Sequence, residues 1–296
     1  LEDGIIDKSK VFACTGAYKL ENYKRPFRCW KRDGHMDVNL SSAVASSCDV
    51  FFYRLAEISG IDFMYDKLQK FGFGQKTYID LYGEKEGLLP SREWKSKNRQ
   101  APWYPGETLN IGIGQGYFLA TPLQLANATS LLASGGSSGT PHLFLRSINR
   151  VNNEVLNFNY SENQQKIDID TRSLHIVNES MWRVIYDKEI GTAAHLKRIE
   201  GLEFAGKTGT AQVKRISMRE RELDLKIEQI PYKDRDHALY IAYGPYINPR
   251  YALSIIVEHG GSGSRTAAPI AKELFKLIID RNDLRNKQKN FEEIKI

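Results

Sequence analysis

Three β-rich runs in the last third of the chain constrain its fold most tightly. They cover residues 202–213, 237–245 and 251–259. Only the compact turn at residues 246–250 separates the last two runs, which predicts that they are antiparallel neighbours. The helical spacing of residues 266–280 then predicts an apolar-faced helix that covers one face of the sheet. The sequence therefore predicts an α/β fold of the α+β type, an antiparallel sheet packed with helices.

Helical spacing also occurs nearer the N-terminus, on both sides of the polar tetrapeptide Ser-Ser-Cys-Asp at residues 46–49. We expect two short helices within residues 38–60 to meet there, with Asp49 as N-cap of the second and Gly60 as its C-terminal stop. Helix capping alone accounts for Ser and Asp in these places, because both are common caps. Residues 63–70 are predicted to form a further amphipathic helix.

The remaining elements are predicted from caps, turn residues and periodicity. They are a loop region over residues 71–106, turns around residues 110–116, a helix from Thr121 and Pro122 to Ala133 that stops at Gly135, two strands within residues 143–158 around a turn at Asn152, a helix over residues 173–186, and a long charged surface connection over residues 214–235.

Length and charge limit the organisation of the chain and its partners. A chain of 296 residues can bury a large core, and we expect one domain over residues 1–280 and a charged tail over 281–296. The 42 Lys and Arg against 36 Asp and Glu are too mixed in sign to predict a nucleic-acid partner. No apolar stretch reaches the about 18 residues that cross a bilayer. Residues 1–4 have the pattern of a helix end, so we expect a trimmed N-terminus.

Residues 201–208, Gly-Leu-Glu-Phe-Ala-Gly-Lys-Thr, match the phosphate-binding pattern G-x-x-x-x-G-K-[ST] letter for letter. That pattern requires a flexible turn between the glycines and a helix that opens at the Lys. Here residues 202–205 alternate like a strand, and the extended run continues to Val213. We therefore favour a strand over the nucleotide site of an NTPase.

As an edge strand, this run would form one wall of a groove. Lys207 would supply an ammonium to that wall, Thr208 and Thr210 two hydroxyls, and Gly209 a backbone without a side chain. These groups suit a substrate carboxylate. Gly209 is expected to let a substrate backbone approach closely, and the N–H of Thr210 is a candidate donor to an oxyanion.

The Lys-Thr-Gly at residues 207–209 follows Ser47-Cys48-Asp49 by about 160 residues. This is the order found in penicillin-binding proteins and class A β-lactamases, with Asp in place of Asn. Further stretches carry the resemblance over nearly the whole chain: residues 34–35, 47–53, 90–95, 113–116, 121–125 and 206–212. Together they resemble the class B penicillin-binding proteins, the peptidoglycan D,D-transpeptidases of cell-wall elongation.

The resemblance implies the penicillin-binding-protein transpeptidase fold and a serine acyl-enzyme mechanism on peptidoglycan stem peptides, with β-lactams as mimics. It gives Ser47 the role of relaying a proton, Asp49 that of orienting the loop, and Lys207 that of holding Ser47 and the substrate carboxylate. The hydroxyls of Thr208 and Thr210 are assigned to that carboxylate. Catalysis would require no cofactor.

The nucleophile motif of the family is missing, because no Ser in the sequence has Lys three residues later. In the family that motif lies on a helix that ends near the equivalent of residues 1–6, so we expect this chain alone to be inactive. A non-catalytic docking module of a wall-synthesis complex is the alternative. For the parent protein the resemblance implies an N-terminal membrane anchor, the periplasmic face of the bacterial inner membrane, and a glycan polymerase and a scaffold protein as partners.

All three cysteines, Cys14, Cys29 and Cys48, occur in the first sixth of the chain, with His35 between the last two. Three thiols and an imidazole are a complete tetrahedral zinc set, which would be structural because no coordination position stays open. The spacings are not those of a zinc finger, so two alternatives remain, a Cys14–Cys29 disulfide and three buried small side chains. The resemblance adds that some relatives carry a metal site at matching places, with carboxylates at some of them.

Overall fold

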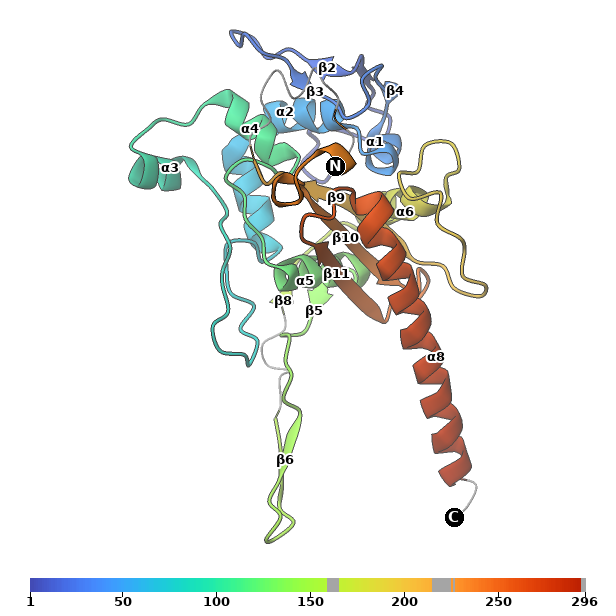
Figure 1. The fold of residues 1–296 in the computed structure, drawn as a ribbon. Helices are drawn as coiled ribbons and strands as arrows, with labels where there is room; N and C mark the ends of the chain where they lie inside the picture. Colours follow the sequence, from blue (N-terminus) through green and yellow to red (C-terminus); the bar gives the residue numbers. More distant parts are fainter. Residues whose placement is uncertain (159–164, 215–224, 226, 294–296) are drawn as a thin grey trace.

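The main sheet has three antiparallel strands in the order β11-β10-β9 (Figure 1). In the computed structural model, which describes residues 1–158, 165–214, 225 and 227–293, β9 spans Ala205–Ala211, β10 His237–Gly244 and β11 Tyr251–Val257. Lys207 pairs with Ile241 across β9 and β10. The three β-rich runs and their antiparallel order are therefore confirmed, and β9 is an edge strand.

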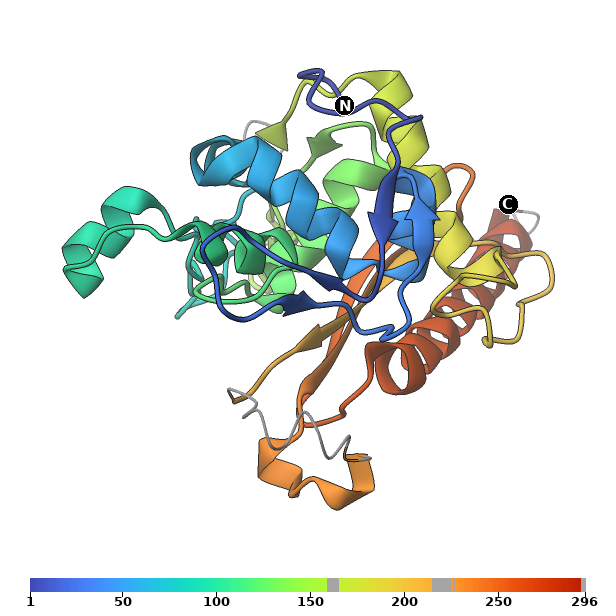
Figure 2. The same ribbon diagram turned by 90° about the horizontal axis from the view of Figure 1, so that it is seen from above.

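Helices cover both faces of this sheet (Figures 1 and 2). Residues of β10 alternate between the faces because successive strand side chains point in opposite directions. Tyr240 packs in the same apolar cluster as Phe275 of α8, whereas Tyr243 packs with Met181 of α6. The covering helices are α5 (Pro122–Ala133), α6 (Thr171–Tyr186) and α8 (Ala268–Glu293).

The predicted helices around residues 46–49 are α1 (Leu40–Ser46) and α2 (Asp49–Lys70). Gly60 has φ of 73° and interrupts the helical backbone within α2, so the predicted stop is a kink between two helical segments. The prediction that Asp49 is the N-cap is wrong. Cys48 occupies that position, and Asp49 is the first helical residue. Short N-terminal strands lie over α1 and α2 (Figure 2).

The other elements within the described residues are short. They are β1 (Phe12–Cys14), β2 (Ala17–Tyr18), β3 (Phe27–Arg28), β4 (Met36–Val38), α3 (Arg92–Arg99), α4 (Pro105–Gly112), β5 (Ser137–Ser138), β6 (Arg146–Ile148), β7 (Val155–Asn157), β8 (Gln165–Lys166), and single helical turns at Ile227–Gln229, Tyr232–Asp234 and Gly263–Ala267.

Two of these helices contradict the predicted loop region and turns over residues 71–116. The start of α3 is capped by Ser91, whose side chain accepts from the N–H of Trp94. The start of α4 has Pro105 in its first turn, and Glu107 accepts the N–H of Tyr104. Local caps therefore make helices of eight residues in a stretch whose Pro, Gly and Trp content suggests a loop.

The structure also describes residues near both ends of the chain. Residues 1–4 form a turn in which the N–H of Gly4 donates to the carbonyl of Leu1 at 3.0 Å, and Gly4 has φ of 69°. The predicted charged tail continues α8 to Glu293. Half of the predicted surface connection over residues 214–235 lies outside the described residues, and the described half includes the helical turns at Ile227–Gln229 and Tyr232–Asp234.

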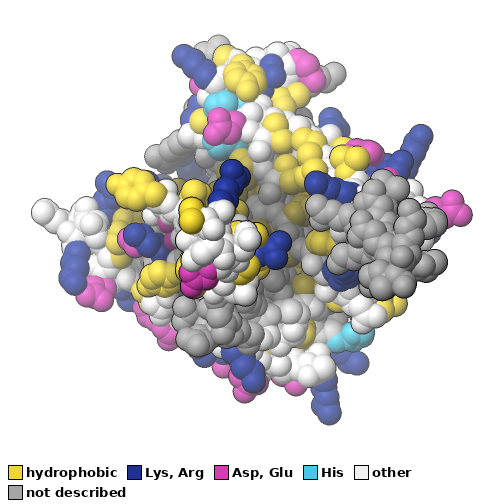
Figure 3. Space-filling model, turned by 90° about the horizontal axis from the view of Figure 1, so that it is seen from below, with side chains coloured by type: hydrophobic (Ala, Val, Ile, Leu, Met, Phe, Trp, Pro, Cys, Tyr) yellow, Lys and Arg dark blue, Asp and Glu magenta, His cyan; other side chains and the backbone are white. Residues whose placement is uncertain are grey.

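Surface charge is mixed in sign. On the face seen from below, basic and acidic side chains are interspersed (Figure 3). Among the helices that the structure describes, none combines the length and apolar character required to cross a membrane.

Candidate active site and metal cluster

Ser47 lies in the bend between α1 and α2, in left-handed backbone conformation with φ of 54° and ψ of 49°. Trp30 holds this bend from outside. Its indole Nε1 donates to the carbonyls of Ser46 and Ser47 at 3.0 and 2.9 Å. Its backbone N–H donates to Asp49 Oδ2 at 2.8 Å. The carboxylate predicted to cap a helix therefore ties a separate loop to the bend.

Lys207 reaches this bend from β9. Its Nζ donates to Ser47 Oγ at 2.5 Å and to the carbonyl of Thr208 at 2.9 Å. Burial lowers the pKa of Lys207 to about 8, and the nearby charge of Asp49 opposes this shift. The two motifs that lie 160 residues apart in sequence thus meet at one hydrogen bond.

Hydroxyl groups extend the site along β9. Thr208 Oγ1 lies 3.5 Å from Ser47 Oγ and 3.0 Å from Thr192 Oγ1. Thr192 is itself held by backbone bonds, because its N–H donates to the carbonyl of Ala45 and its carbonyl accepts from Ser264 Oγ. Thr192 was not predicted as a site residue, because the neighbouring sequence offers only Gly191, which indicates a turn and not a binding site.

The end of the Lys-Thr-Gly-Thr run is more exposed. The carbonyl of Thr210 accepts a hydrogen bond from Gln115 Nε2 at 2.7 Å. A Cβ on Gly209 would lie 3.2 Å from Cβ of Leu239, and a Cβ on Gly263 would lie 2.2 Å from the carbonyl oxygen of Gly209. A glycine is therefore favoured at position 209 by packing, because neighbouring backbone and side-chain atoms approach it closely.

The phosphate-binding pattern at residues 201–208 does not form a phosphate loop. Its second half lies in β9, which stays extended through Lys207 and Thr208 to Ala211. No helix opens at the Lys, so these residues lack the N–H groups that such a loop presents to phosphate.

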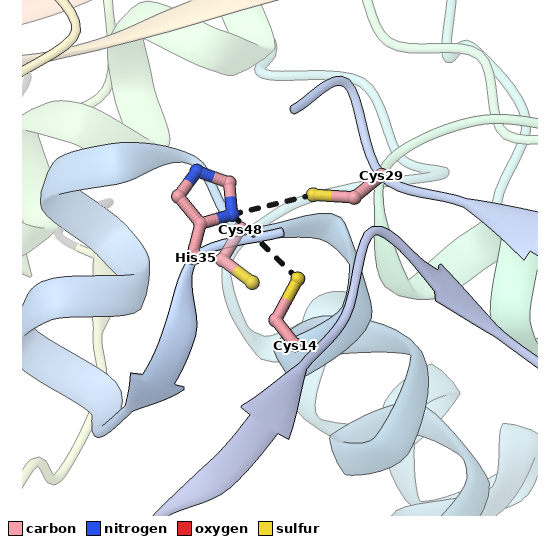
Figure 4. A group of neighbouring side chains, drawn as sticks. All are labelled: Cys14, Cys29, His35 and Cys48. Carbon is pink, nitrogen blue, oxygen red and sulfur yellow. Dashed lines mark hydrogen bonds between the residues drawn. The ribbon is translucent and has the colours of Figure 1, made fainter. Parts of the chain in front are cut away.

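Cys14, Cys29, His35 and Cys48 point toward one another (Figure 4), and their ligand atoms all lie within 4.8 Å of each other. His35 Nδ1 is 3.5 Å from Cys29 Sγ and 3.7 Å from Cys14 Sγ. Bonds of about 2.3 Å to a tetrahedral zinc would separate the ligand atoms by about 3.7 Å. The group therefore fits a metal ion. The alternative of a Cys14–Cys29 disulfide is wrong, since all three cysteines are free.

The electrostatics of the cluster favour a thiolate. A hydrogen bond from Cys48 lowers the pKa of Cys29. The same hydrogen bond to Cys29, together with burial, raises the pKa of Cys48. Burial raises the pKa of Asp49 to about 7, and the charge of Cys29 adds to this shift. His35 Nε2 is buried with no hydrogen-bond partner among the described residues, so only Nδ1 is directed into the cluster.

Comparison with known proteins identifies the family of the chain. The family model described as the penicillin binding protein transpeptidase domain matches residues 1–276. The chain belongs to the penicillin-binding protein transpeptidase family. The predicted family and fold are therefore confirmed.

Relatives of this transpeptidase domain share about a third of its sequence. The peptidoglycan D,D-transpeptidase MrdA of Salmonella typhimurium is 35% identical over 278 residues, which cover 94% of this chain and 44% of the relative. Its Acinetobacter baumannii counterpart is 37% identical over 280 residues, 91% of this chain and 39% of the relative. This chain thus spans less than half the length of these relatives.

Solved structures of penicillin-binding proteins have the same fold as this chain. PBP2 of Pseudomonas aeruginosa in complex with WCK 5153 superposes with a TM-score of 0.78 at 38% identity, covering 93% of this chain and 57% of that one. PBP2 of Helicobacter pylori in complex with MreC superposes with a TM-score of 0.72 at 33% identity, covering 88% and 43%.

The transpeptidase domain also contains a cavity of about 580 Å³ away from Ser47 and Lys207. Mainly apolar side chains of α2 and α6 line it, among them Phe52, Leu55 and Val177. Its lining includes none of the predicted site residues.

Proposed function

We propose that this transpeptidase domain forms part of a peptidoglycan D,D-transpeptidase that cross-links stem peptides through a serine acyl-enzyme. The observation that carries the proposal is the hydrogen bond from Lys207 Nζ to Ser47 Oγ, beside an edge strand that presents Thr208 and Thr210. An ammonium and hydroxyls beside a free strand edge suit a peptide that ends in a carboxylate. The domain would comprise residues 1–280, and residues 281–296 would be a charged extension.

In this mechanism the Ser Oγ of a Ser-x-x-Lys segment bonds to the carbonyl carbon of D-Ala-D-Ala, and its proton passes to the Lys of that segment. The C–N bond then breaks, and Ser47 relays the proton from that Lys to the leaving amine, so that both return to their starting protonation states. Lys207 holds Ser47, and the N–H of Thr210 stabilises the oxyanion. An amine of a neighbouring stem peptide then attacks the acyl-enzyme and restores the Ser. Asp49 keeps the bend in place through Trp30.

The 296 residues contain no Ser-x-x-Lys, so we propose that acylation requires that segment from a longer chain. The test is intact mass after incubation with a penicillin. It is run on this chain and on the parent gene's version extended upstream by about 20 residues, the length of a helix that could carry the motif.

We expect an adduct on the extended chain alone, and none when its motif Ser is replaced by Ala. An extended chain that contains the motif and stays unmodified would refute the transpeptidase proposal and favour the docking module.

Complexes of similar proteins support a proposal about the location and partners of the parent protein. One similar structure is a PBP2 complex with MreC, and another is a peptidoglycan synthase complex in which polymerization and crosslinking are coordinated. We propose that the parent protein acts at the periplasmic face of the bacterial inner membrane, beside a glycan polymerase and a scaffold protein. Co-purification of the full-length parent with both tests this.

We further propose that Cys14, Cys29, His35 and Cys48 hold a structural zinc ion. The four ligand atoms converge at distances that suit tetrahedral coordination, and four protein ligands leave no position for substrate. The zinc would stabilise the fold without entering the reaction.

Protein purified with reducing agent should contain one zinc per chain, and Cys14→Ser should lower both the zinc content and the melting temperature. Full stability after chelation, with no zinc in the purified protein, would contradict this.

A further inference from the structure

Gln115 links the α4–α5 connection to the edge of the sheet, 95 residues away in sequence. Its side-chain amide donates to the carbonyl of Thr210 at 2.7 Å. The backbone of Gln115 is fixed independently, because its N–H donates to the carbonyl of Asn110 at 2.9 Å. The hydrogen bond to β9 is therefore made by the side chain alone.

The accepting carbonyl belongs to the edge of β9 that pairs with no strand in the described part of the chain. In an edge strand, alternate carbonyl and N–H groups point away from the sheet and can pair with another extended chain. Because Gln115 reaches the carbonyl of Thr210 from outside the sheet, this carbonyl is one of the outward groups. The same residue provides the N–H that the proposed mechanism assigns to the oxyanion.

An extended peptide that binds to this edge would present a backbone N–H to the carbonyl of Thr210. The primary amide of Gln115 is chemically equivalent to that N–H and already holds this acceptor. We propose that Gln115 occupies the peptide-binding acceptor of β9 in the free enzyme and is displaced by the secondary amide of an acyl-donor peptide or a β-lactam. The inference rests on the proposed function and names a specificity-determining residue for it.

The test uses the extended chain that carries the Ser-x-x-Lys segment. Second-order acylation rate constants are measured with a penicillin that has an acylamino side chain and with a penam that lacks this amide. Gln115→Ala and Gln115→Met remove the donor, and the second keeps the bulk of the side chain. Gln75→Ala is the control, because Gln75 makes the same kind of bond, from Nε2 to the carbonyl of Gln69 at 2.9 Å, away from β9.

We expect both Gln115 variants to react about three- to tenfold faster with the acylamino penicillin, the gain expected when water replaces an intramolecular hydrogen bond at the acceptor. Their reaction with the penam that lacks the amide should equal that of wild type, as should Gln75→Ala with both compounds. Equal rates for all proteins would overturn the inference, because the carbonyl would then accept both donors at once.

A parallel loss with both compounds would also overturn it, because Gln115 would then only support the site. No acylation of the wild-type extended chain would instead refute the proposed function itself, and this inference with it.

Discussion

Replacing Lys207 by Met is expected to stabilise the fold at neutral pH, although it removes a residue assigned to catalysis. Burial lowers the pKa of Lys207 from the ordinary 10.5 to about 8, which means that the folded protein disfavours the charged ammonium. At 1.36 kcal/mol per unit, the shift corresponds to about 3 kcal/mol. Met fills a similar volume and carries no charge.

Part of this gain is offset by lost hydrogen bonds. Met cannot donate to Ser47 Oγ or to the carbonyl of Thr208, and each such bond contributes about 1 kcal/mol. The free energy of unfolding at pH 7 should therefore rise by about 1 kcal/mol in Lys207→Met. Acylation of the extended chain should fall about a hundredfold or more, because a preorganised donor is lost.

The pH dependence separates this reasoning from a simple packing effect. The pKa of Lys207 is lower in the folded protein than in the unfolded chain, so the cost of its charge is fully present below about pH 8. That cost disappears as the pH rises from about 8 to 10.5, because the folded protein then holds the neutral amine. The advantage of Lys207→Met should therefore vanish as the pH rises and become a loss of about 1 kcal/mol at pH 10, where the two lost hydrogen bonds outweigh the remaining cost of the charge.

The assay is urea unfolding of this chain and of Lys207→Met, with identical zinc and reducing agent, at pH 7 and pH 10. Both proteins share every other titrating group, so the difference between them isolates Lys207. A variant that is less stable at pH 7, or a difference that is the same at both pH values, would refute the buried-cation argument.

Two further predictions concern stability and use the same urea assay. Gly263→Ala should lower the free energy of unfolding by about 3 kcal/mol, because its Cβ would lie 2.2 Å from the carbonyl oxygen of Gly209. Gly139→Ala is the control and should cost less than about 1 kcal/mol, because nothing lies within 4 Å of its Cβ. Equal costs would contradict the steric argument. Lys95→Met should lower the free energy of unfolding by about 3 kcal/mol, because Glu107, whose carboxylate lies 2.5 Å from Lys95 Nζ, then has no cation beside it. Adding Glu107→Gln should recover part of this loss. A double variant no more stable than Lys95→Met would exclude charge as the cause.

Much of the fold could be predicted from local signals. The start of α5 has both Thr121 as a cap, accepting from the N–H of Gln124, and Pro122 in the first turn. The hairpin of β6 and β7 follows from alternation on both sides of Asn153, which adopts φ of 57°. Helices α3 and α4 were missed because each is eight residues long and depends on a cap within residues typical of loops.

The site was predictable only in part. Ser47 and Lys207 belong to motifs whose residue types indicate the chemistry, and the structure brings them together. Trp30, Thr192 and Gln115 act through hydrogen bonds to segments distant in sequence, and nothing in the neighbouring sequence indicates which carbonyl or hydroxyl they reach. Such contacts depend on how elements pack, which periodicity does not specify.

The cluster of Cys14, Cys29, His35 and Cys48 and the bend around Ser47 are parts of one local structure. Cys29 and Trp30 are adjacent, and each contacts the second segment: the thiol of Cys29 interacts with Cys48, and Trp30 bonds to Ser47 and Asp49 on either side of it. A displacement of Cys29 must therefore move Trp30 and release the carbonyl of Ser47. We therefore expect loss of the cluster to displace Ser47 and to slow acylation of the extended chain, while the pairing of β9 with β10 stays intact.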